Sequence, residues 1–334
     1  LVLPHYAAMQ QASPQIAALS DESAAFPIGP REFVGMMASL MALNALAIDA
    51  MLPAFPAIGE SFAITDANER QFIISSYLLG MGIGSLFYGP ISDRFGRRAV
   101  LLGAMSLYAI FALLCAMAPS FDILLALRFA QGMSAAALGV LAVSIIRDRF
   151  VGDGMARRMS MVFIVFMAVP VLAPTLGQLV LYVSSWRAIF VLLAVMAGVV
   201  ATWVGIRLPE TLPPEQRSEI RPRAIGQAWR KVTFNRIGLF YILAAGTVMG
   251  ALFGFLNSSQ QIFADLFGMP EIFPYAFACV AGCMAIASYS NSRIVERFGA
   301  RRVSHTALIS FILLSIGQAA ASQMSPEPLL LFIV

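Results

Sequence analysis

Two ionisable side chains, Asp49 and Arg128, lie deep inside long apolar stretches of the sequence. An arginine at the centre of a membrane-spanning helix costs at least about 2.5 kcal/mol, so it needs a functional or pairing role. A carboxylate in a dehydrated cavity can bind and release a proton within a reaction cycle. We therefore expect Asp49 to couple proton movement to another event, with Arg128 as its candidate counter-charge. The alternative for Asp49 is a structural carboxylate near the outer end of its helix.

Two uncharged polar residues belong to the same predicted centre. Gln131 follows Arg128 by three positions and therefore shares its helix face, and Asn44 lies on the same apolar stretch as Asp49. We expect Asp49, Arg128, Gln131 and Asn44 to line a cavity for a small molecule. Few other polar side chains are available in the apolar stretches, whereas aromatic ones are. The aromatic candidates for the cavity wall are Tyr77, Phe87, Tyr241 and Phe255.

A segment rich in glycine and arginine follows the second apolar stretch. Gly84 and Gly89 are predicted to let another helix approach closely, because they have no side chain. Gly96 permits the tight reversal that joins two helices through so few residues. Asp93 can interact with a helix N-terminus or with arginines. Within this segment, the predicted functional residues are Gly84, Gly89, Asp93, Arg94, Gly96, Arg97 and Arg98.

The end of this segment recurs later in the chain. Asp93 to Arg98 reads as an acid, arginine, phenylalanine, glycine and two arginines, and Glu296 to Arg301 follows nearly the same order. Each copy follows an apolar stretch at a corresponding place in the sequence. Parallel halves with one helix order would produce such a repeat. We therefore predict two related halves.

Two prolines interrupt the fifth apolar stretch. Pro170 and Pro174 each lack a backbone N–H group, so a helix that contains them is expected to bend. Gly177 lies about one turn after Pro174. A bent helix without any directional role is the plain alternative.

The composition requires a lipid environment for these elements. Of 334 residues, 59% are hydrophobic and 12% are charged, with a mean hydropathy of +0.80. Soluble domains carry about 25% charged residues. A bilayer core needs about 20 apolar residues per helical crossing. We predict helices at 33–56, 71–91, 99–118, 121–146, 159–181, 186–206, 237–258, 270–291 and 303–322. A tenth stretch is short and the chain starts at Leu1, so we expect a fragment.

Basic residues gather in alternate loops. They cluster at 94–98, 147–158, 207–236 and 293–302, whereas the opposite loops contain only Arg70 and Arg187. An excess of lysine and arginine marks the cytoplasmic side, which predicts a cytoplasmic N-terminus. We divide the chain into a disordered cytoplasmic tail at 1–30, a six-helix half at 31–208, a cytoplasmic linker at 209–235 and an incomplete second half at 236–334.

Several of these segments resemble motifs of the major facilitator superfamily. They are the loop that ends at Arg98, the run from Arg128 to Gly132, the run from Ala173 to Gly177, and the run from Leu208 to Leu212. Together with Ile48 to Pro56, they look most like the Bcr/CflA drug-resistance branch. The resemblance covers residues 31–334. It implies an all-α bundle of transmembrane helices in two six-helix halves, with the second half truncated in this chain.

The resemblance also implies roles for two of the motifs. The loop from Gly84 to Arg98 would act as a conformational switch that latches the two halves on the cytoplasmic side. Pro170, Pro174 and Gly177 would form the antiporter motif that is typical of exporters, although Val169 and Gln178 stand where glycines are common. The implied location is the bacterial inner membrane.

Three functions compete at this stage. The first is an exporter of hydrophobic or cationic drug-like molecules in exchange for protons. The second is a proton symporter for nutrient uptake, which would need a more polar cavity. The third, a membrane-embedded enzyme, is remote, because the sequence offers no metal-ligand cluster, nucleophile triad or phosphate-binding loop. We expect no cofactor, a proton gradient as the energy source, membrane lipid around a monomer, and no nucleic-acid partner.

Overall fold

The computed structural model is helical wherever it has regular secondary structure in the residues described. Those residues are 27–66, 68–150, 152–218, 226, 227, 230, 233–263, 268, 276, 279, 280, 282, 283, 286, 287, 290, 294 and 298–324. The all-α class that the resemblance implies is confirmed for this part of the chain.

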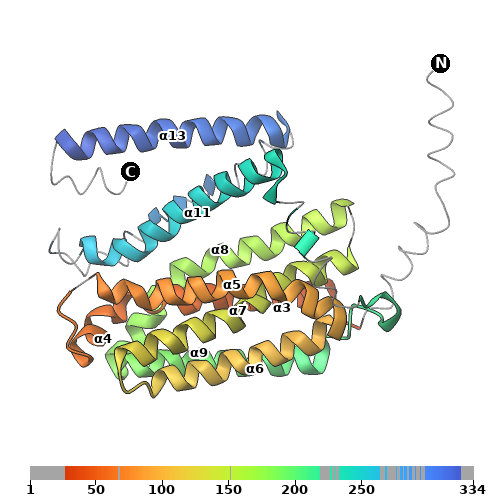
Figure 1. Cartoon of the computed structure of the whole chain (residues 1–334), viewed down its shortest axis with the longest axis horizontal. Helices are drawn as coiled ribbons and strands as arrows, with labels where there is room; N and C mark the ends of the chain where they lie inside the picture. The colour runs from red at the N-terminus through yellow and green to blue at the C-terminus, as the bar shows by residue number, and fades with distance from the viewer. Residues whose placement is uncertain are drawn as a thin grey trace.

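The first half forms a packed bundle, which occupies the lower part of Figure 1. Its helix α7 contacts α3, α5, α6 and α8, and α3 in turn contacts α8 and α9. The core is apolar and contiguous, with large side chains such as Phe33, Met36 and Leu40 fully buried. The bounds are α3 Pro30–Asp49, η2 Leu52–Ala54, α4 Phe55–Ser61, η3 Glu69–Gln71, α5 Phe72–Phe95, α6 Arg97–Ala116, α7 Phe121–Arg149, α8 Gly152–Val183 and α9 Trp186–Arg207.

The first predicted helix is interrupted. We expected one helix over 33–56, whereas α3 ends at Asp49 and a 3₁₀ turn joins it to α4. Pro53 lies in this turn and Pro56 lies in the first turn of α4. Each proline lacks the N–H group that would continue an α-helix, but proline is tolerated at a helix start. The break therefore follows directly after Asp49.

Helices α5 and α7 approach each other backbone to backbone. A Cβ atom at Gly80 would collide with the carbonyl group of Phe129, and one at Gly84 would collide with Met133. From the other side, a Cβ atom at Gly132 would collide with the backbone of Tyr77. Small residues allow this kind of contact between helices in membranes. The close approach predicted at Gly84 is confirmed.

The outer surface of the bundle is apolar. Ile110 on α6 and Val195 and Val199 on α9 are 50%, 57% and 64% exposed. Seven helical segments among the described residues are long and apolar enough to cross a membrane, and a shorter apolar stretch covers Leu172–Val183. Large exposed apolar surfaces mark contact with lipid or protein. The chain is a multi-pass membrane protein.

The second half contributes two long described helices, α11 at Arg236–Gln261 and α13 at Ala300–Met324. Figure 1 shows both outside the bundle, on the side of α8. Gly299 precedes α13 with a φ of 80°, as Gly96 precedes α6 with a φ of 92°. The repeated motif therefore places its glycine at a positive φ in both copies.

Several predicted segments lie wholly or mostly outside the described residues. They are the tail at 1–26, the middle of the linker, the helix at 270–291 and the stretch after 324. The described start of the linker, 209–218, follows α9 and contains the 3₁₀ turn η4 at Pro214–Gln216.

Candidate functional site

Arg128 occupies the centre of the bundle, and its side chain is fully buried. Helix α7 carries it into the interface with α3 and α5. Its Nε donates to the carbonyl oxygen of Ile73 at 3.2 Å, and its Nη2 donates to that of Ala47 at 2.9 Å. Its Nη1 donates to Oε1 of Gln131 at 2.8 Å. The guanidinium group thus joins three helices through hydrogen bonds, as a buried charge requires.

Aromatic rings complete the surroundings of Arg128. Its guanidinium carbon lies 4.3 Å from the centre of the Tyr77 ring and 5.7 Å from that of Phe190. Such cation–π contacts stabilise a desolvated cation. The Tyr77 hydroxyl donates to Oδ1 of Asn44 at 3.0 Å. Arg128, Gln131, Tyr77 and Asn44 therefore form one connected polar centre in an apolar bundle.

Asp49 lies at the last position of α3 and is 2% exposed. Its Oδ1 atom has no hydrogen-bond partner among the described residues. The ion pair with Arg128 that the sequence suggested does not form; the guanidinium group instead donates to Ile73, Ala47 and Gln131. The guanidinium group of Arg128, from α7, thus binds α3 at Ala47, two residues before Asp49, and forms no ion pair with the Asp49 carboxylate.

The break in the first helix explains how Arg128 reaches this segment. The amide of Met51 donates to the carbonyl of Ile48 at 3.4 Å, three residues back, instead of to Ala47 four residues back. The carbonyl of Ala47 is left for the guanidinium group. Backbone groups inside a membrane need an internal partner. Arg128 supplies that partner two residues before Asp49.

The proline-containing helix α8 packs against the same break. A Cβ atom at Gly177 would collide with the carbonyl group of Ala50 and lie 3.1 Å from the Pro53 ring. Pro174 is buried one turn earlier, and α8 continues through Pro170 and Pro174 as an α-helix. The predicted antiporter segment therefore meets the residue that follows Asp49.

The loop between α5 and α6 lies at the end of the bundle where α9 and the linker meet. Arg97 is 4% exposed, and it pairs with Oδ1 of Asp93 at 2.7 Å and with Oδ2 of Asp148 at 2.8 Å. Arg98 donates to the carbonyl of Gly205 on α9, and Arg94 is exposed beside Phe95. The tight reversal predicted at Gly96 is confirmed by its φ of 92°.

Gly89 makes no close contact with a described residue, so the approach of another helix at this position stays a prediction. A Cβ atom there would meet no described atom within 4 Å, whereas Gly80, which the prediction omitted, makes the close contact one turn before Gly84. Of the predicted aromatic residues, Tyr77 lies in the polar centre, but Phe87 and Tyr241 are 53% and 64% exposed. The exposed rings do not contact Arg128.

Sequence reasoning missed Asp148 and Phe190 as partners. Asp148 stands between Arg147 and Arg149, and an acid within a cationic run is a signal that an ion pair could form there. Phe190 follows Trp186 and Arg187 in the sequence and carries no charge that could have indicated this contact.

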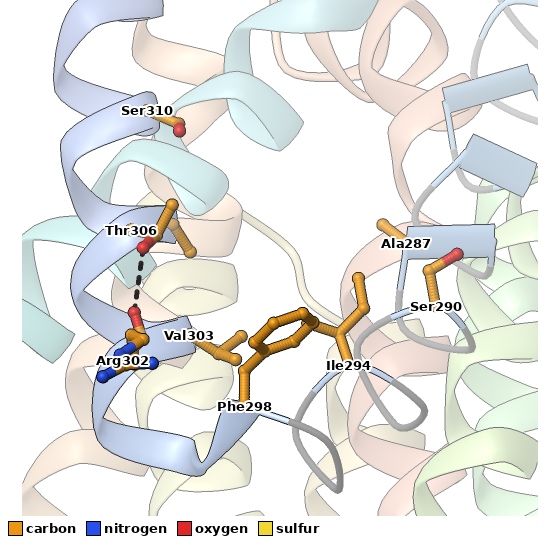
Figure 2. Close-up of a pocket in the computed structure, with 9 residues that line it drawn as sticks. Ala287, Ser290, Ile294, Phe298, Arg302, Val303, Thr306 and Ser310 are labelled. Carbon is orange, nitrogen blue, oxygen red and sulfur yellow. Dashed lines mark hydrogen bonds between the residues drawn. The ribbon is translucent and has the colours of Figure 1, made fainter.

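A separate cavity of about 420 Å³ lies in the second half, and Figure 2 shows its lining residues. Ile294 and Phe298 form part of one wall, and α13 forms the other with Val303 and Thr306. In Figure 2, the guanidinium group of Arg302 points away from Phe298. None of the predicted site residues lines this cavity.

Comparison with known proteins places the chain in a family. The major facilitator superfamily profile matches residues 37–334. An uncharacterized MFS-type transporter of Bacillus subtilis, YdgK, is 33% identical over 80% of this chain and 65% of its own length. The bicyclomycin resistance protein homolog of Haemophilus influenzae is 31% identical over 83% of this chain and 69% of its own length. The chain thus spans somewhat less than two thirds of the first relative.

A solved structure agrees on the fold. The proton:xylose symporter XylE aligns with a TM-score of 0.62 at 16% identity, over 80% of this chain and 69% of that one. The resemblance to the drug-resistance branch is confirmed by the bicyclomycin resistance homolog. From the matched profile and these relatives, we conclude that the chain belongs to the major facilitator superfamily.

Proposed function

We propose that the protein is a secondary transporter that exports hydrophobic or cationic small molecules in exchange for protons. The observation that carries the proposal is Asp49, a buried carboxyl group with an unpartnered oxygen at a break in the first helix. Because no described basic side chain pairs with it, this group can gain or lose a proton without breaking an ion pair. Proton and cargo would compete for one site at Asp49.

Arg128 supports this proposal in a different way from the expected counter-charge. Its cationic head is fixed by three hydrogen bonds and by the ring of Tyr77. It therefore provides a constant positive charge and holds the broken end of α3, while Asp49 changes its charge during the cycle. Asn44, placed by Tyr77, would contribute an amide to the cavity wall.

The direction of transport is supported by α8 and by the relatives. Gly177 of the antiporter-like segment packs closely against the backbone of Ala50, which follows Asp49. Movement of α8 would therefore alter the surroundings of the carboxyl group. A bicyclomycin resistance homolog and a multidrug resistance protein, MdtL of Escherichia coli, are among the relatives. We place the protein in a bacterial inner membrane as a monomer with a cytoplasmic N-terminus, driven by the proton gradient and without a cofactor.

The test compares Asp49→Asn with Asp122→Asn, an exposed acid at the start of α7. Cells that contain each variant are loaded with a fluorescent lipophilic cation, and efflux is followed with and without a proton gradient. Asp49→Asn is expected to abolish gradient-driven efflux, because the side chain can no longer exchange a proton. Asp122→Asn is expected to match the wild type. Undiminished proton-coupled efflux in Asp49→Asn would place the coupling site elsewhere.

A further inference from the structure

The start of α6 is capped by a carboxylate from another part of the chain. Glu210 follows α9, yet its Oε1 accepts a hydrogen bond from the amide of Arg97 at 2.8 Å. Its Oε2 accepts one from the amide of Arg98 at 3.3 Å. These amides are the first two of α6, and such groups have no partner within their own helix. A carboxylate at a helix N-terminus is also favoured by the helix dipole.

Glu210 at the same time organises its own segment. Its Oε1 accepts from the amides of Thr211 at 3.0 Å and Leu212 at 3.1 Å. Arg217 lies 3.9 Å from Oε2. Four backbone amides and one cation therefore surround a single carboxylate that is 27% exposed.

Gly96 makes room for this arrangement. A Cβ atom at position 96 would collide with the carboxylate of Glu210 and would lie 2.9 Å from the Arg217 guanidinium. The glycine thus serves two needs, the positive φ of the reversal and the space for a side chain that follows α9. Helix α6 itself offers no side-chain cap at this position.

Two further bonds tie the same elements together. Arg98 donates to the carbonyl of Gly205 on α9, and the amide of Ser218 in the linker donates to the carbonyl of Asp93 at 3.0 Å. Arg97, whose amide Glu210 holds, pairs through its side chain with Asp93 and Asp148. The carboxylate therefore lies where α5, α6, α9 and the linker meet.

We propose that Glu210 is a positioning residue of the transport cycle: it holds the α5–α6 loop, the end of α9 and the first ten linker residues, 209–218, together as one unit. Arg97 is thereby kept in register with Asp148. Glu210 does not contact the Arg128 centre, so its removal should change the rate of switching and leave cargo binding intact. The rate readout depends on the proposed transport function, but the exchange readout below does not.

The first experiment measures hydrogen exchange in the purified whole chain in lipid nanodiscs. Peptides that contain residues 94–101 and 208–214 are compared in the wild type, Glu210→Ala, Glu210→Gln and the control Glu215→Ala, which changes an exposed acid of the same segment. Glu210→Ala should make both peptides exchange about tenfold faster, the effect of losing hydrogen bonds to a charged group. Glu210→Gln keeps one acceptor oxygen but turns an NH₂ group toward Arg98. Its exchange rate should therefore lie between those of the wild type and Glu210→Ala.

The second experiment measures transport in vesicles. Glu210→Ala should lower the maximal rate and leave the half-saturating cargo concentration unchanged, while Glu215→Ala should match the wild type. Exchange in Glu210→Ala equal to that of Glu215→Ala would overturn the inference. Uniformly faster exchange along the whole of α6 and α9 would also overturn it, since it would indicate general destabilisation. An unchanged maximal rate in Glu210→Ala would show that Glu210 has no role in the conformational switch. This conclusion would hold for any transported cargo.

Discussion

Arg128 shows how one side chain can serve several elements at the scale of a residue. Its planar head offers donors in several directions, and the structure uses them for Ala47, Ile73 and Gln131. A lysine has one compact charge and cannot reproduce this fork. The positive charge is therefore tied to the backbone of α3 and α5, and Asp49 stays free of it. In the proposed transport cycle, the separate neighbours of the two groups let Arg128 keep its charge while Asp49 exchanges a proton.

Arg128→Ala is expected to lower the free energy of unfolding by about 3 kcal/mol, because three acceptors lose a charged donor in a buried site. Arg128→Lys should recover part of the stability and part of the efflux. Thermal unfolding in detergent and efflux of a lipophilic cation would measure the two effects. Arg31→Ala, at an exposed position of α3, is the control and should resemble the wild type. Wild-type stability in Arg128→Ala would show that water replaces the guanidinium group without cost.

At the scale of elements, α3 and α8 meet where both deviate from plain apolar helices. The first helix breaks after Asp49, and α8 carries Gly177 at the level of that break. Glycine at position 177 lets the two backbones touch at Ala50. Close backbone contact transmits a displacement directly, since no flexible side chain lies between. We infer that α8 and the broken end of α3 move together.

Gly177→Ala tests this contact. The added methyl group would collide with the backbone carbonyl of Ala50, which cannot turn aside as a side chain can. Overpacking of this kind typically costs about 1–3 kcal/mol. We expect a lower melting temperature and slower efflux. Gly198→Ala on α9 is the matched control, because a Cβ atom there would meet nothing within 4 Å. Equal behaviour of the two variants would mean that α8 yields freely at this point.

At the scale of the whole molecule, the described part consists of a packed six-helix bundle and two long helices of the second half. The repeated motif precedes α6 and α13, with Gly96 and Gly299 both at a positive φ. Basic residues lie near both repeats and in the linker. This distribution predicts that both repeats lie on the cytoplasmic side of the membrane.

Reporter fusions test this topology. A fusion after Glu215 is expected to report a cytoplasmic location, because the linker joins two halves of even helix number. A fusion after Asp265 is expected to report the opposite side, since α11 crosses the membrane once in between. A fluorescent reporter that folds only in the cytoplasm and a phosphatase active only outside would distinguish the two. The reverse result at either position would contradict the proposed orientation.

Much of this protein could be derived from the sequence because the signals are local. Hydropathy over about 20 residues locates a membrane helix, and prolines and glycines mark breaks and reversals. The cost of burying charge singles out Asp49 and Arg128 without any knowledge of their neighbours. The reversal at Gly96 and the close approach at Gly84 follow from the same reasoning.

Only the tertiary structure decided which groups meet. Arg128 and Asp49 suggested an ion pair by their charges, but the broken end of α3 exposes a backbone carbonyl that takes the guanidinium group instead. Glu210 caps a helix that begins 113 positions earlier in the chain. Gly177 meets Ala50, whereas Gly89 meets no described atom. These outcomes depend on the register and rotation of whole helices against one another, and no window of local sequence determines them.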